Sequence, residues 1–98
     1  MSEAPRFTVS QFVSVTNQVL ETGLSDVVVF GEVSSFKVNQ GKWVFFDLKD
    51  PESSIGCFMT IYQLGGFPLE DGMKIAVQAT PKLTAFGKFS LTINAFIL

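Results

Sequence analysis

The fold is decided by residues 27–49, which read VVVFGEVSSFKVNQGKWVFFDLK. The first part, residues 27–36, alternates in character with a period of two, which predicts a β-strand. One face of this strand carries Val29, Gly31 and Val33, and the other carries Val28, Phe30, Glu32 and Ser34. A glycine inside a strand marks a bend or a bulge, so we expect one at Gly31.

A polar connection at residues 39–41 leads to a second strand, residues 42–49. Two sets of residues alternate along it: Val44, Phe46 and Leu48 against Trp43, Phe45 and Asp47. A charged side chain belongs on the solvent face of a half-buried strand, so Asp47 assigns the two faces. Trp43 and Phe45 are therefore predicted to point outward with it.

Three more strands follow the same rule. The third comes after a proline-containing turn at residues 50–53, and its faces carry Ile55, Cys57 and Met59 against Gly56, Phe58 and Thr60. The fourth has Met73, Ile75, Val77 and Ala79 against Lys74, Ala76, Gln78 and Thr80. Pro81 interrupts this strand and predicts an edge or a bulge. A turn around Gly87, at residues 84–88, precedes the fifth strand, residues 89–98, in which one face is expected to carry Phe89, Leu91, Ile93 and Ala95.

Residues 8–20 predict a helix that begins after Thr8, because Gln11 completes a capping box with it, and Gly23 is placed to end it. Its apolar stripe comprises Val9, Phe12, Val13, Thr16, Val19 and Leu20. We expect this stripe to pack on the strands, because a small barrel needs a cover; the alternative is a groove for a partner.

One helix and five short strands predict a mainly β fold, a closed or nearly closed five-stranded Greek-key barrel. A flat sheet of this length would expose two long edges. We divide the chain into residues 1–26, an N-terminal segment with a capping helix, and residues 27–98, the barrel, within one structural domain.

The composition excludes several classes of protein. The 98 residues are 47% hydrophobic and 16% charged, which excludes a disordered chain. With one cysteine and no histidine, we expect neither a disulfide nor a metal site, and no cofactor. No apolar run is long enough to span a bilayer and no signal peptide is evident, so we expect a cytoplasmic protein with no membrane partner.

Motifs along the chain resemble the N-terminal domain of the exodeoxyribonuclease VII large subunit. The two main ones are FGEVSSF at residues 30–36 and WVFFDLKD at residues 43–50. Four others follow in the order and spacing of that family: FTVSQ at 7–11, IGCFM at 55–59, EDGMK at 70–74 and GKFSL at 87–91. The resemblance covers residues 7–97.

This resemblance implies an oligonucleotide-binding (OB) fold that grips single-stranded DNA. In that family a separate C-terminal region carries the nuclease chemistry and joins the small subunits, so this chain looks like an isolated N-terminal fragment. We accordingly expect no catalytic residue here. The parent protein would be a single-strand-specific exodeoxyribonuclease with the small subunit as its partner.

OB barrels bind on the outer face of strands two and three, between the loops that join strands one to two and four to five. On this face we expect bases to stack on Trp43, Phe45 and Phe58. Phe36 and Phe86 flank the rim. Four of the six lysines lie in or beside the two loops and would contact phosphates: Lys37, Lys42, Lys82 and Lys88.

A second hypothesis is an OB-type module that docks another protein and has little affinity for nucleic acid. The net charge of −2 favours it, since nucleic-acid binders are usually basic. So do the departures from the family pattern. Trp43 stands where members usually have histidine, and Gly56 and Gln78 stand where they often have arginine. Around the last hairpin, Thr84 and Phe86-Gly87 stand where tyrosine and Arg-Gly are common. The same exposed aromatic residues would serve either purpose.

Overall fold

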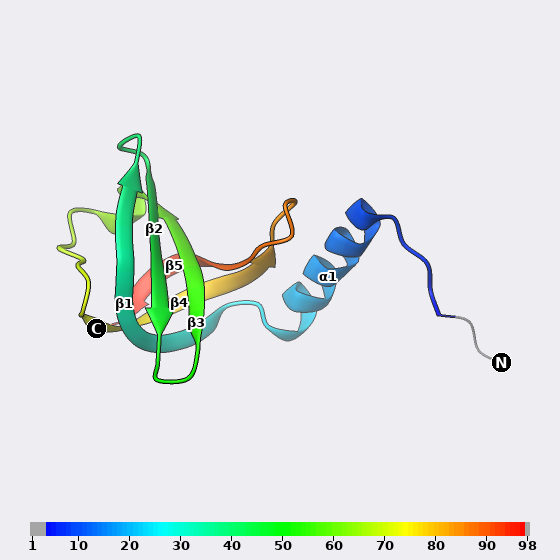
Figure 1. Ribbon diagram of the computed structural model, residues 1–98, viewed down its shortest axis with the longest axis horizontal. Coiled ribbons are helices and arrows are strands. Elements are labelled where there is room, and N and C mark those ends of the chain that lie inside the picture. The colour runs from blue at the N-terminus through cyan, green and yellow to red at the C-terminus, as the bar shows by residue number, and fades with distance from the viewer. Residues whose placement is uncertain (1–3, 98) are drawn as a thin grey trace.

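The computed structural model describes residues 4–97. Five strands form a closed barrel in the order β1-β2-β3-β5-β4, which confirms the predicted architecture (Figure 1). The elements, in chain order, are α1 (Val9–Gly23), β1 (Val27–Asn39), β2 (Trp43–Lys49), β3 (Ser54–Thr60), α2 (Ile61–Leu64), β4 (Lys74–Leu83) and β5 (Phe89–Ile97). Neighbouring strands are antiparallel except β3 and β5, which run parallel and close the barrel.

The core is formed by the inward faces predicted for the middle of the chain. On β2 the buried residues are Val44, Phe46 and Leu48, and on β3 they are Cys57 and Met59. Gly31 lies where β1 passes from β4 to β2, and a Cβ built on it would be 2.7 Å from the carbonyl oxygen of Lys49. The glycine is therefore required by a close backbone approach.

The bulge in β1 lies further along the strand than Gly31. The register with β2 shifts between Ser34 and Lys37, and Ser35 has a φ of 55°. Two residues of β1, Ser35 and Phe36, thus oppose one residue of β2. After the bulge the alternation is reversed, so Phe36 packs against the core instead of lying on the rim as predicted.

A second bulge corrects the assignment of the last strand. The pairing of β4 with β5 shifts between Gln78 and Ala79, which leaves Asn94 as an extra residue in β5. Ala95 is consequently exposed, and Phe96 turns inward, where its ring stacks on Phe67 at a centroid distance of 4.9 Å. Leu98, the predicted last residue of the strand, lies outside the described residues.

Pro81 lies within β4 and does not interrupt it, because the pairing with β5 continues to Leu83. The predicted edge is nevertheless present, since the pairing of β4 with β1 ends at Ala79. The backbone of Leu83 faces this open edge, and so does that of Pro81 two residues earlier. A proline is tolerated there because no hydrogen-bond partner is missing.

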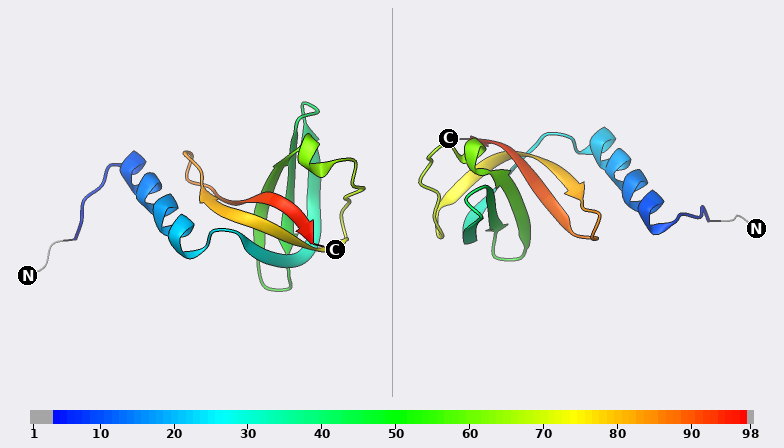
Figure 2. Two further views of the ribbon diagram at one scale, coloured as in Figure 1. Left: turned by 180° about the vertical axis from the view of Figure 1, so that it is seen from behind. Right: turned by 90° about the horizontal axis from the view of Figure 1, so that it is seen from above.

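The expected packing of α1 on the barrel is found only in part, because Val13, Thr16 and Leu20 of its apolar stripe are half-buried and the rest of the stripe is exposed. The helix begins at the predicted capping box, with the Thr8 side chain accepting from the Gln11 backbone, but none of its residues is buried. Val9 is 81% exposed and Val19 65%. In both views of Figure 2 the helix extends to one side of the barrel. Asn17 bonds the helix to β4: its side chain donates to the carbonyl of Leu83 (2.9 Å) and accepts from the N–H of Leu83 (2.8 Å). The Asn17 side chain thus pairs with the edge of β4 as the backbone of a neighbouring strand would.

The short helix α2 was not predicted. Thr60 caps it, and Gln63 completes a capping box of the same form as that of Thr8 and Gln11. The helix ends at Gly65, which has a left-handed conformation with a φ of 59°. The sequence therefore carried a signal for this helix, a threonine followed three residues later by a glutamine.

Candidate nucleic-acid interface

The outer face of the barrel is organised in rows of residues that lie opposite one another on neighbouring strands. Residues in direct cross-strand register share a face of the sheet. One row runs through all five strands: Lys37 on β1, Phe45 on β2, Phe58 on β3, Thr92 on β5 and Thr80 on β4. A charged residue, two aromatic residues and two hydroxyl residues are thus aligned across the barrel.

Three aromatic side chains, Trp43, Phe45 and Phe58, form a cluster on this face that we call the aromatic platform. The centroid of the Phe58 ring lies 5.6 Å from that of Trp43 and 5.3 Å from that of Phe45. Phe58 therefore holds the cluster together, at distances typical of favourable aromatic pairs. Trp43 is 40% exposed, and the other two rings are half-buried. The platform presents apolar surface to solvent on the strands where the sequence predicted it.

All four candidate lysines are exposed around the platform. Lys37 lies directly beside Phe45 in the register, and Lys42 ends the β1–β2 turn, next to Trp43. Lys82 of β4 pairs with Ser90 of β5, and Lys88 follows in the β4–β5 turn. Two of the lysines thus lie on β1 and the β1–β2 turn, and the other two lie on β4 and the β4–β5 turn.

The β4–β5 turn also presents Phe86, which is 93% exposed. The turn is held by three hydrogen bonds: the Thr84 N–H donates to the Lys88 carbonyl, the Lys88 N–H to the Thr84 hydroxyl, and the Gly87 N–H to the Thr84 carbonyl. Phe86 is therefore displayed on an ordered turn.

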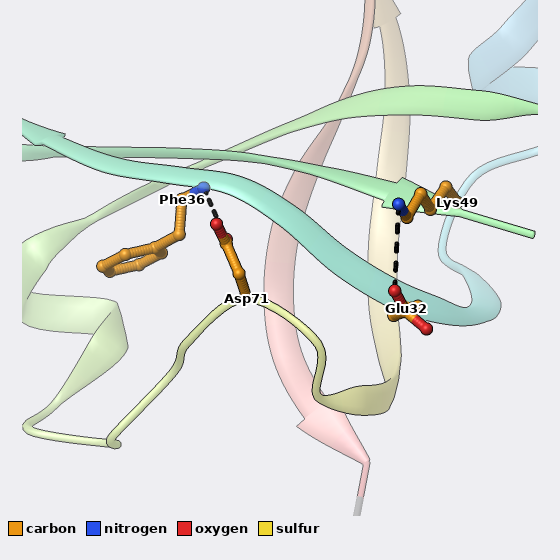
Figure 3. A network of polar contacts seen from close by, with 4 residues as sticks. All are labelled: Glu32, Phe36, Lys49 and Asp71. Atoms are coloured by element: carbon orange, nitrogen blue, oxygen red, sulfur yellow. Dashed lines mark hydrogen bonds and ion pairs between the residues drawn. The ribbon is translucent and has the colours of Figure 1, made fainter.

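Figure 3 shows two polar contacts of β1. The ammonium of Lys49 lies 3.8 Å from the carboxylate of Glu32, so the charge of this lysine is compensated. The N–H of Phe36 donates to the Asp71 carboxylate at 2.9 Å, which satisfies a backbone group that the bulge leaves unpaired.

Asp47 shares the outer face with the platform. Its row consists of Ser34, Asp47, Gly56, Ser90 and Lys82. Burial, and to a smaller extent the charge of Asp47, raises the pKa of the Cys57 thiol to about 12. Cys57 is thus a core residue and is not an activated nucleophile.

A hollow of the barrel lies apart from this face. It has a volume of about 860 Å³ and is lined by residues of β1, β4 and β5, by residues 49–51 at the end of β2 and in the turn after it, and by Phe67 and Met73. None of the nine candidate residues lines it.

A closed five-stranded barrel with this strand order, an aromatic platform on β2 and β3 and basic turns beside it define the OB class of binding domains. The chain belongs to the family described as the OB-fold nucleic acid binding domain, whose model matches residues 7–96.

The resemblance found in the sequence motifs is also confirmed. The chain is 33% identical over 89 residues to the exodeoxyribonuclease 7 large subunit of Clostridium botulinum (strain Eklund 17B / Type B), with 86% of this chain and 22% of that protein covered. It is 34% identical over 102 residues to the large subunit of Histophilus somni (strain 129Pt), with 100% and 22% covered. The chain thus spans about a fifth of the length of these relatives.

Among solved structures, the fold is similar to that of a chain in a replication protein A heterotrimer bound to ssDNA. The TM-score is 0.63 at 14% sequence identity, with 74% of this chain and 56% of that chain covered. This likeness supports the fold assignment. Within the described part of the chain, neither helix combines the length and the apolar character that a membrane span requires.

Proposed function

We propose that this domain binds single-stranded DNA, with bases stacked on the aromatic platform and phosphates near Lys37, Lys42, Lys82 and Lys88. The observation that carries the proposal is the contact of Phe58 with both Trp43 and Phe45 on the outer face of β2 and β3. Stacking on aromatic side chains contributes about 1–3 kcal/mol per base and tolerates any sequence, because every base has a π-face.

The arrangement of charge supports the same proposal. The chain as a whole is acidic, with a net charge of −2, but Lys37 lies beside Phe45 in the strand register and Lys42 directly precedes Trp43, while Lys82 and Lys88 lie on the β4–β5 hairpin. A local group of cations attracts phosphates within a Debye length, roughly 8–10 Å at moderate salt. Phe86 on the β4–β5 turn is placed to add a contact at one end of the bound strand.

For the longer protein we propose the role that its relatives' names suggest. The domain would be the part of an exodeoxyribonuclease VII large subunit that grips the substrate, while a C-terminal nuclease region and the small subunit complete the enzyme. Cleavage of the strand would belong to that region, because the three side chains of the platform are aromatic and cannot act in general acid–base chemistry.

The test is fluorescence anisotropy of a labelled single strand of about 20 nucleotides, titrated with the wild type and with Trp43→Ala. A Phe30→Ala variant is the matched control, because Phe30 is 81% exposed and lies outside the platform. We expect Trp43→Ala to raise the dissociation constant about 5-fold or more and Phe30→Ala to leave it unchanged. Absence of binding even at low salt would overturn the proposal and favour a protein-docking module.

A further inference from the structure

Asp47 is an acidic side chain of the platform face, and its surroundings leave it open to a ligand. It lies two residues after Phe45 on β2, so both side chains point to the same side of the sheet. Its cross-strand neighbours are Ser34 on β1 and Gly56 on β3. A Cβ built on Gly56 would lie 3.8 Å from the Asp47 Oδ1 atom, so the glycine leaves the space beside the carboxylate uncovered.

The carboxylate of Asp47 is also uncommitted. Within residues 4–97, the aspartates whose carboxylates accept hydrogen bonds are Asp26, Asp50 and Asp71. The nearest cation along β2 is Lys49, and its ammonium forms an ion pair with Glu32. Asp47 is half-buried at the border of an apolar cluster, where an unpaired acceptor gains most from a new donor.

The chemistry of a single strand decides what this acceptor can bind. A carboxylate repels phosphates, so the sugar–phosphate backbone is kept toward the lysines and the edge of a stacked base is directed to Asp47. An ionised carboxylate only accepts hydrogen bonds. Guanine offers it two adjacent donors, N1–H and the N2 amino group, whereas the thymine edge has a single N–H between two repelling carbonyl oxygens.

We propose that Asp47 reads the base beside Phe45 and gives the interface a preference for guanine. This inference rests on the proposed function, to which it adds a modest selectivity on top of sequence-tolerant stacking. Gly56 contributes by leaving room for the base edge, and the half-buried setting strengthens the two hydrogen bonds relative to a fully exposed carboxylate.

The test compares two 20-nucleotide strands at one salt concentration, alternating thymine–guanine and alternating thymine–hypoxanthine. These strands differ in the N2 amino group alone. We expect the wild type to bind the guanine strand about 3- to 10-fold more tightly. In Asp47→Ala the two strands should bind equally, and oligo-dT should bind more tightly than to the wild type, because a negative charge is removed from the face.

The outcomes separate the two proposals. Binding of both strands by the wild type without discrimination, or discrimination that survives in Asp47→Ala, overturns the role of Asp47 and leaves the single-strand function intact. Failure of the wild type to bind any of the strands overturns the function and the inference with it. A Glu52→Ala variant, which removes an acidic residue from the nearby β2–β3 turn, controls for net charge and should keep the preference.

Discussion

The salt dependence of binding offers a quantitative test of the lysine positions. For single strands, the logarithm of the binding constant falls with the logarithm of salt concentration with a slope of about −0.7 per phosphate contact. Four exposed lysines beside the platform (Lys37, Lys42, Lys82 and Lys88) therefore predict a slope of about −2.8, or a loss of about 50-fold in affinity between 50 and 200 mM salt.

The perturbation is the double variant Lys42→Ala/Lys88→Ala, which removes one lysine from each of the two turns. We expect the slope to fall to about −1.4 and the loss of affinity over the same salt range to about 7-fold. The measurement is fluorescence anisotropy of an oligo-dT strand at four or more salt concentrations. A slope equal to that of the wild type would refute the placement of phosphates near these two lysines.

A matched control is the double variant Lys49→Ala/Lys74→Ala, which changes the net charge by the same amount. Lys49 is paired with Glu32, and Lys74 lines the hollow on another part of the barrel. This variant should keep a slope of about −2.8. Equal slopes in the two double variants would mean that total charge, and not position, governs binding.

Three further predictions concern the fold. Gly31→Ala should lower the free energy of unfolding by about 1–3 kcal/mol in a denaturant titration, because the added Cβ meets the Lys49 carbonyl oxygen at 2.7 Å. The control is Gly23→Ala, which should be neutral or stabilising because nothing lies within 4 Å of the added Cβ. Equal effects of the two substitutions would contradict this reasoning. Two backbone N–H groups lower the pKa of Asp50, so the stabilisation from its carboxylate is present above the unfolded-state pKa and is lost as the pH falls through the folded-state pKa. The difference in unfolding free energy between wild type and Asp50→Ala should therefore shrink below about pH 4. A difference that stays constant with pH would be inconsistent with this prediction. The buried Cys57 thiol, with a pKa of about 12, should resist a thiol reagent at pH 8 until denaturant is added, and rapid labelling of the folded domain would show the assignment to be wrong.

The period-two pattern correctly placed the middle strands because each has one face in the core and one in solvent. Val44, Phe46 and Leu48 are buried as predicted, and the outward position of Asp47 correctly placed Trp43 and Phe45. The aromatic platform was therefore predictable from the sequence.

The two wrong face assignments share one cause. Phe36 and Ala95 each follow a bulge, and one extra residue reverses the alternation for the rest of the strand. The same bulge that turns Phe36 into the core brings Lys37 beside Phe45. A bulge depends on how the strands bend to close the barrel, which no local pattern in the chain reports.

The amphipathic pattern of α1 predicted the helix, its start and its packing on a strand, but not how much of its apolar stripe stays exposed. The capping box at Thr8 and Gln11 is a local interaction, so the sequence contains all of it. The position of the helix depends on Asn17 and on the open edge of β4 at Leu83, which are 66 residues apart in the chain. A hydrophobic face specifies that burial is favourable, not which surface supplies it.

The sequence by itself determined the strands, the alternation of their faces, the cap of the first helix and the aromatic and basic character of the interface, because these depend on neighbouring residues. Only the tertiary structure decided the bulges, the exposure of α1 and the row that joins Lys37, Phe45 and Phe58 with β5. These depend on register between strands distant in the chain, which is fixed when the barrel closes and its core is filled.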